Sequence, residues 1–172
     1  MDAARRRGGV TLWITAAIVL VCDRLTKLWA EHALPDHPRD VIDGILRFRY
    51  TTNSGGAFSL GDRAPLVFAV AAIAVCAAIA ITSFRARSAW HAVALGLVLG
   101  GAAGNLIDRI RSTRGVVDFL DVGIGALRWP TFNVADIAVS CGAIALVVSM
   151  WREDVRQPEP PTAPVLQGHD AE

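Results

Sequence analysis

Four long apolar runs divide the chain and predict four helices that span a membrane. A helix needs about 20 consecutive apolar residues to cross the hydrocarbon core of a bilayer. The predicted spans cover residues 10–30, 64–84, 90–108 and 132–151. The second run carries no charged residue, and in the third only His91 near its start and Asp108 at its end can carry a charge.

The first run has two interpretations. Its stretch VTLWITAAIVLVC follows three arginines at positions 5–7 and has only the length of a signal peptide, with Cys22 placed as in a lipoprotein cleavage site. Against this, Val21 is large where such a site needs a small residue. If the helix continues through DRLTKLWA, the run reaches the full length of a span. We favour this continuous helix.

The continuation contains a possible ion pair. Asp23 and Lys27 stand four residues apart, where opposite charges on one helix face can pair. Lys27 is also close to Trp29, so its ammonium could instead extend to the membrane interface.

Glycine recurs at every fourth residue in the third run, at Gly96, Gly100 and Gly104. Small residues at this spacing let a second helix approach closely. The pattern predicts that another helix packs along this face.

The segment between the first two runs has the pattern of a strand. In ILRFRYTTN, Leu46, Phe48 and Tyr50 alternate with polar side chains, as in a half-buried strand. Asp43 and Gly44 supply a turn just before it. We therefore expect a small extracytoplasmic sheet within residues 39–63.

The other connections are read from composition. The segment RSTRGVVDFLDVGIGALRWP, residues 111–130, is too short for a domain and too apolar for a solvated linker, so it is expected to lie at the membrane surface. Residues 157–172 hold four prolines and are predicted to be a disordered cytoplasmic tail. Residues 1–156 are expected to form one membrane domain.

Composition supports the membrane class and excludes others. The chain is 53% hydrophobic and 19% charged, which is too apolar for an ordinary soluble domain of 172 residues. A net charge of +1 and the lack of a basic patch interleaved with aromatic residues argue against a nucleic-acid partner. Cys22, Cys76 and Cys141 lie in apolar runs without metal-ligand spacing, and we interpret them as buried packing residues.

The arginines give the orientation only in part. With four spans, seven arginines flank one side of the membrane and eight flank the other, so counting does not decide the orientation. The three arginines at positions 5–7 adjoin the first helix, which usually dominates. This predicts that both termini are cytoplasmic.

Four polar motifs fall at helix ends or in loops on the same predicted side of the membrane. They are NSGGAF at 53–58, GNLIDR at 104–109, VVDFLD at 116–121 and FNVAD at 132–136. Asn105 and Asp108 are three residues apart, as are Asn133 and Asp136, so each amide shares a helical face with its carboxylate. We expect these two pairs to meet across a helix interface. An ionisable residue at the entrance of a span, such as Asp136, costs about 2.5–3.5 kcal/mol on insertion scales and therefore indicates a function.

The chemistry available to these motifs is that of carboxylates. The sequence holds no GxSxG and no HExxH, and its four histidines, at 32, 37, 91 and 169, lie outside the motifs. Two aspartates held together cannot both ionise cheaply, so one keeps a proton while the other acts as a base toward water. This division of roles can hydrolyse a peptide bond. The residues alone do not choose between Asp118 and Asp121, and Asp108 is expected to hold Arg109 in an ion pair.

Five motifs in order, DRLTK at 23–27 and the four above, give the chain a resemblance to signal peptidase II, a family of bacterial membrane aspartyl peptidases. The family pattern usually reads N-x-G-A-A-F, and here Gly56 replaces its first alanine. By this resemblance, Asp118 and Asp136 are the catalytic pair. The positions around the family's active site are Asn53, Gly55, Asn105, Asp108, Arg109, Asn133 and Ala135, and the motif with a structural or supporting role includes Asp23 and Lys27.

The resemblance also implies a fold, a location and a substrate. The fold is mainly helical, with four transmembrane helices, a small extracytoplasmic sheet and a short surface helix or loop over the site. The location is the bacterial cytoplasmic membrane, with the active site near the extracytoplasmic face. The substrate is a diacylglyceryl-modified prolipoprotein in membrane lipid, cut just before its lipidated cysteine, and no metal or organic cofactor is implied.

Two other functions are weighed against the peptidase. A small proton-coupled channel or transporter also contains intramembrane Asp, Asn and Arg residues. However, the polar motifs cluster at one end of the predicted helices, and the middle of the run at 64–84 has no charged side chain. A conduction path needs polar groups along its length. A membrane scaffold would leave the acidic residues in apolar settings unexplained.

Overall fold

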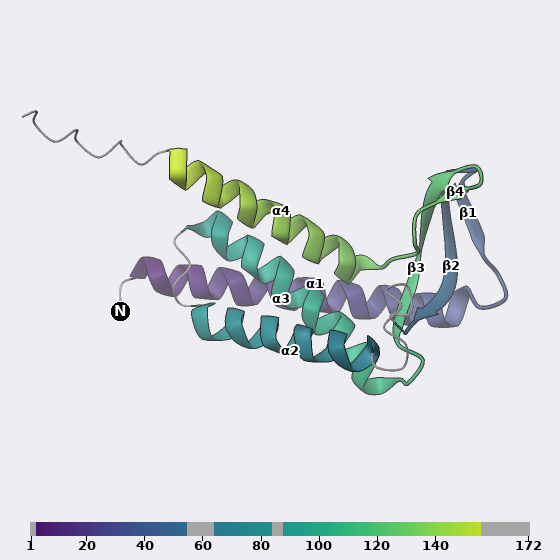
Figure 1. Ribbon diagram of the computed structural model, residues 1–172, viewed down its shortest axis with the longest axis horizontal. Coiled ribbons are helices and arrows are strands. Elements are labelled where there is room, and N and C mark those ends of the chain that lie inside the picture. Colours follow the sequence, from purple (N-terminus) through teal and green to yellow (C-terminus); the bar gives the residue numbers. More distant parts are fainter. Residues whose placement is uncertain (1–2, 55–63, 84–87, 156–172) are drawn as a thin grey trace, which may run out of the picture.

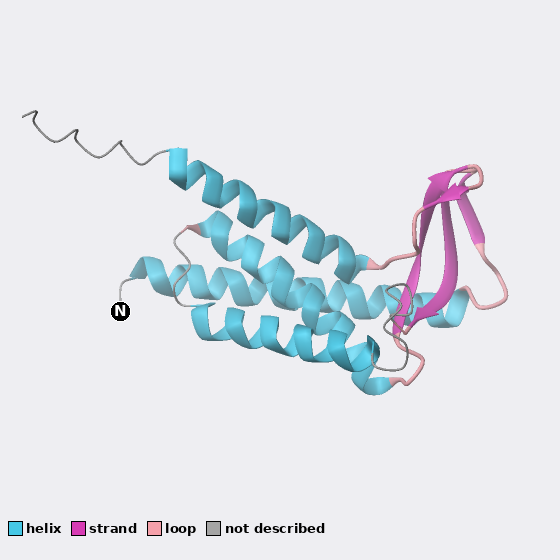
Figure 2. Ribbon diagram, viewed as in Figure 1, coloured by secondary structure: helices cyan, strands magenta, loops and turns pink. Residues whose placement is uncertain are grey.

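The computed structural model describes residues 3–54, 64–83 and 88–155, and within them all four predicted runs form helices. These are α1 (Ala3–Ala33), α2 (Ala64–Thr82), α3 (Ala89–Arg111) and α4 (Val134–Val155). The helices form an elongated bundle in which α3 packs against each of the other three (Figure 1). A small sheet stands at one end of the bundle (Figure 2). Gly55 and the predicted tail at 157–172 lie outside the described residues.

Helix α1 continues without a break through DRLTKLWA, as the favoured interpretation predicts. The predicted pairing of Asp23 and Lys27 is confirmed, with Lys27 Nζ 2.9 Å from Asp23 Oδ2. The alternative, in which the Lys27 ammonium extends to the membrane interface, is wrong, because the Lys27 side chain is fully buried. A buried ammonium requires anionic or polar partners, and the bundle interior supplies them.

The glycine pattern of α3 is explained by its contact with α1. A Cβ atom built on Gly96 would lie 2.6 Å from the Leu12 carbonyl oxygen, and one on Gly100 would lie 2.6 Å from the Ala16 carbonyl oxygen. Both distances are too short for real atoms, so only glycine allows this approach. Gly104 continues the face and packs against the carboxylate of Asp23. The predicted close helix packing is confirmed.

Two of the four helices are long and apolar enough to cross a bilayer by length and composition, over Arg6–Ala33 and Ala89–Arg111. The other two have shorter apolar stretches, Leu66–Thr82 and Val134–Ser149. The outer surface of the bundle is nevertheless apolar in α2 and α4 as well, where Leu66, Ile81 and Ile144 are largely exposed. The prediction that the cysteines are buried is wrong for Cys22 and Cys141, because both are exposed on this apolar outer surface.

The sheet is built from the segments that follow α1 and α3. Strands β1 (Arg39–Ile42), β2 (Leu46–Asn53), β3 (Val116–Ile124) and β4 (Leu127–Arg128) are antiparallel and pair in that order. The predicted strand in ILRFRYTTN is β2, and the predicted turn before it contains Gly44 at φ 71°. Both predictions are confirmed.

The position of residues 111–130 at the membrane surface stays a prediction, and the structure adds that this segment contains strands β3 and β4 of the sheet, which the sequence did not indicate. The first half of β3 is buried on both faces. One face packs against the end of α1, where Phe119 joins Ala30 and Leu34 in a hydrophobic cluster. A strand covered on both faces lacks the apolar–polar alternation that identifies a half-buried one.

Candidate active site

Asp136 and Asn133 cap the beginning of α4 together. The Asn133 side-chain oxygen accepts a hydrogen bond from the Asp136 backbone N–H at 3.0 Å, and the Asp136 carboxylate accepts one from the Asn133 backbone N–H at 3.2 Å. This reciprocal pair is a capping box. A carboxylate in the first turn is also favoured by the helix dipole. The N-terminus of α4 therefore fixes Asp136 in place and offsets part of the cost of its charge.

Asp118 lies on β3 and is almost completely buried, at 3% exposure. Its Oδ1 atom accepts a hydrogen bond from the Asn133 side-chain amide at 2.6 Å. Asn53, at the end of β2, also forms a side-chain hydrogen bond with Asp118. The pairing of Thr51 with Asp118 across β2 and β3 fixes the register that brings these residues together.

Asn105, on α3, joins the two carboxylates. Its amide nitrogen donates to Asp136 Oδ1 at 2.8 Å, and its oxygen accepts from the Asn133 amide at 3.2 Å. The Asn133 amide in turn donates to Asp118, so a chain of two asparagines connects one aspartate to the other. The predicted meeting of the two Asn–Asp pairs is confirmed.

Burial and, as the second cause, the negative charge of nearby Asp136 raise the pKa of Asp118 to about 7. The hydrogen bonds from Asn133 and Asn53 lower this pKa only in part. Asp118 therefore holds a proton up to near neutral pH while a second carboxylate lies close by. This is the environment in which two aspartates take different protonation states.

A buried charge network supports the site from α1. Lys27 Nζ lies 2.9 Å from Asp23 Oδ2 and 2.8 Å from Asp108 Oδ2. It also donates to the Asn105 oxygen at 2.9 Å, which orients the amide that contacts Asp136. Asp23 accepts a hydrogen bond from the Ala135 backbone N–H at 3.0 Å and so ties α1 to the first turn of α4.

The expected ion pair between Asp108 and Arg109 is wrong. Asp108 pairs with Lys27 and with Arg24, whose Nη1 atom lies 2.5 Å from Asp108 Oδ1. Arg109 instead donates to the Asn105 carbonyl at 3.2 Å and lies over the ring of Phe68. Adjacent residues of a helix point in different directions, so neighbours in sequence do not face each other.

Asp121 is occupied differently from Asp118, although both are buried on β3. Arg128 Nε donates to its Oδ1 atom at 2.9 Å, and Arg49 Nε lies 3.2 Å from its Oδ2 atom. These two arginines compensate the charge of Asp121 within the sheet. The tertiary structure thus separates two aspartates that the sequence leaves equivalent.

Sequence reasoning missed several residues around the site. Arg24 lies inside the DRLTK motif, and its pairing with Asp108 could not be found without knowing that α1 and α3 are in contact. A cavity of about 290 Å³ opens beside Asp136, and its apolar walls include Trp129, Phe132 and Ile137. Trp129 stands just before the fourth predicted span, and a tryptophan at such a place is typical of a membrane interface. The sequence could therefore have indicated this residue.

Comparison with known proteins identifies the family. A family model described as Signal peptidase (SPase) II matches residues 15–152. The chain belongs to the signal peptidase II family. The resemblance carried by the five motifs is therefore confirmed. Membership makes this protein a peptidase, and the channel or transporter is not favoured.

Relatives and solved structures agree with the signal peptidase II assignment. The lipoprotein signal peptidase of Oleidesulfovibrio alaskensis is 38% identical over 148 residues, which cover 82% of this chain and 94% of the relative. That of Syntrophus aciditrophicus is 42% identical over 145 residues, which cover 80% of this chain and 89% of the relative. A bacterial membrane enzyme solved by the in meso method at 2.3 Å is similar with a TM-score of 0.74 and 27% identity, over 88% of this chain and 94% of that one.

Proposed function

We propose that this signal peptidase II is an aspartic endopeptidase that removes the signal peptide from diacylglyceryl-modified prolipoproteins by cutting just before the lipidated cysteine. Asp118 and Asp136 form its catalytic pair. The names of its relatives support the substrate class. The observation that carries the mechanism is the connection of the two carboxylates through Asn133 and Asn105.

The two aspartates have different roles in this mechanism. Asp136 accepts a proton from a water molecule, which attacks the carbonyl carbon of the scissile peptide bond. Protonated Asp118 donates a hydrogen bond to the carbonyl oxygen and then its proton, giving a neutral tetrahedral intermediate. When the C–N bond of that intermediate breaks, Asp136 gives the leaving nitrogen the proton that it took from water. Asp118 takes back a proton from a hydroxyl group of the intermediate, which leaves a carboxylic acid and restores both aspartates. The raised pKa of Asp118 supports its role as the acid.

Asn105, Asn133 and Asn53 hold the pair in position by hydrogen bonds to the two carboxylates. Lys27, Asp23, Asp108 and the backbone of Ala135 form the charge network behind them. Gly55 and Arg109 match the family's positions around the site.

The proposed membrane position uses all four helices as spans. Both segments that form the sheet then lie on one side of the membrane, because one follows α1 and the other follows α3. With both termini in the cytoplasm, the catalytic pair lies near the extracytoplasmic face of a bacterial cytoplasmic membrane. The acyl chains of the substrate remain in lipid while its peptide reaches the cavity beside Asp136, under a short surface helix or loop.

Replacement of the aspartates by asparagine tests the mechanism. Asparagine keeps the volume but cannot act as the base or carry the shared proton. We expect Asp118→Asn and Asp136→Asn each to lower the cleavage rate of a diacylglyceryl-modified prolipoprotein peptide in detergent by about 10²–10⁴-fold or more, the usual size of an acid–base contribution.

Asp121→Asn is the matched control, because it also removes a buried carboxylate from β3. The carboxylate of Asp121, however, is paired with two arginines of the sheet. It should retain activity within about tenfold, provided that its melting curve shows a folded protein. If either Asp118→Asn or Asp136→Asn cleaves at a near wild-type rate, the catalytic pair is misassigned.

A further inference from the structure

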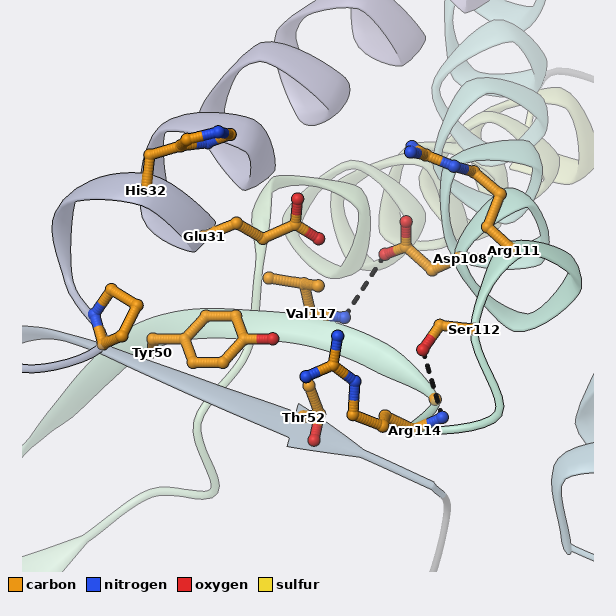
Figure 3. A pocket seen from close by; sticks show the side chains of 11 residues that line it. Glu31, His32, Tyr50, Thr52, Asp108, Arg111, Ser112, Arg114 and Val117 are labelled. Carbon is orange, nitrogen blue, oxygen red and sulfur yellow. Dashed lines mark hydrogen bonds between the residues drawn. The ribbon is translucent and has the colours of Figure 1, made fainter.

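Asp108, near the end of α3, connects three elements of the molecule. Its side chain is buried and lines a cavity of about 510 Å³ between the ends of α1 and α3 and the sheet (Figure 3). Its Oδ1 atom pairs with Arg24 at 2.5 Å, and its Oδ2 atom pairs with Lys27 at 2.8 Å. The Oδ2 atom also accepts a hydrogen bond from the Val117 backbone N–H at 3.3 Å (Figure 3). One carboxylate thus holds α1, α3 and β3 together.

The contacts of Asp108 continue to both aspartates of the proposed catalytic pair. Val117 precedes Asp118 on β3, so the hydrogen bond to the Val117 N–H holds the backbone from which Asp118 extends. Lys27 donates to the Asn105 oxygen at 2.9 Å, and the Asn105 amide donates to the second aspartate at 2.8 Å. Asp108 therefore acts on one aspartate through the strand and on the other through Lys27.

Asp108 needs a second cation, because Lys27 is shared. An ammonium has three N–H donors, and that of Lys27 has three partners, namely Asp23, Asp108 and the Asn105 oxygen. A buried carboxylate without a compensating charge is strongly unfavourable. If Lys27 alone compensated both carboxylates, one net negative charge would remain, and it would draw the ammonium away from Asn105. Arg24 supplies the second positive charge, so the network contains two carboxylates and two cations.

The other arginines of the cavity face a different carboxylate. The carboxylate of Glu31 lies between the guanidinium groups of Arg111 and Arg114 (Figure 3). Arg111 also lies beside Asp108, but among the described residues the ion pairs of Asp108 are those with the two cations of α1. Since one of these cations also serves the catalytic network, Arg24 is the cation that compensates Asp108 alone.

We propose that Arg24 is a positioning residue of the peptidase and that it acts through Asp108. This inference rests on the proposed function. The Arg24 guanidinium keeps Asp108 charged and in place. The Val117 backbone then remains anchored, and Lys27 remains available to orient Asn105.

Hydrogen exchange tests the anchoring of β3 without any peptidase activity. Deuterium uptake of the full chain in detergent is followed by mass spectrometry. We expect Arg24→Gln to speed uptake in the peptide that contains Val117 by about fivefold or more, because the acceptor of this N–H is no longer held by a charge-assisted bond. Arg47→Gln is the matched control, since it also removes an arginine that pairs with an aspartate, but this pair, with Asp40, is exposed on the sheet. It should leave the uptake unchanged.

Cleavage kinetics test the effect of Arg24 on the reaction. Arg24→Gln should lower kcat for a diacylglyceryl-modified prolipoprotein peptide by about tenfold and leave KM within about twofold, because positioning acts on the chemical step. Arg24→Lys keeps the positive charge but loses the planar fork, and it should restore kcat to within about threefold of wild type. Arg47→Gln should change neither constant. Melting curves confirm that the variants are folded.

Asp108→Asn tests whether Arg24 acts through Asp108. Asparagine has no charge for Arg24 to compensate. Adding Arg24→Gln to Asp108→Asn should therefore change the deuterium uptake and kcat by less than about twofold, which is the non-additivity expected of residues in contact.

Three results would overturn the proposal. If Arg24→Gln leaves the uptake of the Val117 peptide unchanged, Arg24 does not anchor β3. If the uptake rises but kcat stays near the wild-type value, Arg24 has a structural role only. If Arg24→Gln has the same effect with and without Asp108→Asn, it does not act through Asp108. A wild-type protein that does not cleave the peptide would overturn the proposed function, and the exchange experiment would still decide whether Arg24 anchors β3.

Discussion

At the scale of single residues, the site depends on the unequal surroundings of similar side chains. Asp118, Asp121 and Asp108 are all buried, but two of them have cationic partners and Asp118 has amide partners and a second carboxylate nearby. An arginine or lysine stabilises the charged form of a carboxylate, whereas burial beside a like charge stabilises the protonated form. The partners, and not the residue type, therefore decide which aspartate can act as an acid near neutral pH.

The raised pKa of Asp118 makes stability depend on pH. The pKa is about 7 in the folded protein and 3.8 for an unperturbed aspartate, so the folded state binds the proton more tightly. The contribution of Asp118 to stability is therefore full below pH 3.8 and is lost as the pH rises through about 7. Asp118→Asn removes this ionisation and should melt at a higher temperature than wild type at pH 8.

Melting curves in detergent at pH 5 and pH 8 measure this effect. The difference between wild type and Asp118→Asn should be clearly larger at pH 8 than at pH 5. Asp121→Asn is the control, since Asp121 is paired with arginines and its loss should not stabilise the protein at either pH. Equal differences at the two pH values would contradict the proposed protonation of Asp118.

Asn133 has two functions that substitution can separate. Its side-chain oxygen caps α4, and its amide donates to Asp118. Asn133→Ser keeps a good capping residue but loses the amide. We expect a stability close to wild type and a cleavage rate lower by up to about tenfold, which corresponds to a hydrogen bond between uncharged groups.

Asn133→Ala completes this comparison, since it loses both functions. Asn133→Ala should lower the free energy of unfolding by about 0.5–2 kcal/mol more than Asn133→Ser does, which is the usual cost of a lost cap. Chemical unfolding and cleavage assays on the same samples measure both effects. If the serine variant is fully active, the amide of Asn133 does not position Asp118.

At the scale of elements, α3 is the centre of the bundle because glycine replaces side chains where α1 meets it. Gly100 faces α1, where a Cβ atom would lie 2.6 Å from the Ala16 carbonyl oxygen and 2.7 Å from Val19 Cβ. The same two helices carry Lys27 and Asn105, whose contact is 2.9 Å long. Close packing of α1 and α3 is therefore a condition for the hydrogen bonds at the proposed catalytic pair.

Gly100→Ala should push α1 and α3 apart. We expect it to destabilise the protein by about 1–3 kcal/mol, the usual cost of overpacking, and to lower the cleavage rate because Lys27 can no longer orient Asn105. Ala77→Val is the control, since it adds more volume on the exposed face of α2. Thermal melting and cleavage assays measure both variants. An unchanged melting temperature for Gly100→Ala would show that the interface can adjust.

At the scale of the whole molecule, the alternation of four helices brings both sheet-forming segments to one end of the bundle (Figure 1). The proposed catalytic residues lie at this end, Asp118 on β3 and Asp136 in the first turn of α4. The four-span proposal makes this end extracytoplasmic. Alkaline phosphatase inserted at Gly44, in the turn between β1 and β2, should therefore be active in cells. A fluorescent protein fused after residue 172 should fold and fluoresce in the cytoplasm.

The two reporters give opposite signals for a reversed orientation. An inactive phosphatase at Gly44 with a dark fluorescent protein at the C-terminus would place both termini outside the cytoplasm. Phosphatase activity at Gly44 together with a dark C-terminal reporter would mean an odd number of spans. The first result would overturn the proposed orientation, and the second would overturn the four-span topology.

The sequence by itself determined the helices, the strand β2 and the residues that meet at the site. Apolar runs predict helices because length and composition alone decide whether a segment can be buried in lipid or in a bundle. The spacing of Asn and Asp in GNLIDR and FNVAD predicts shared helical faces in the same way. The five motifs also identified the family.

Only the tertiary structure decided which charges pair and what β3 does. Asp108 pairs with Arg24 and Lys27, which are far from it in sequence, and not with its neighbour Arg109. Residues 116–124 became a strand because β2 pairs with it, and its first half is buried on both faces, so it has no alternating pattern. Ion pairing and burial depend on distances between segments, and a single sequence without its fold does not contain those distances.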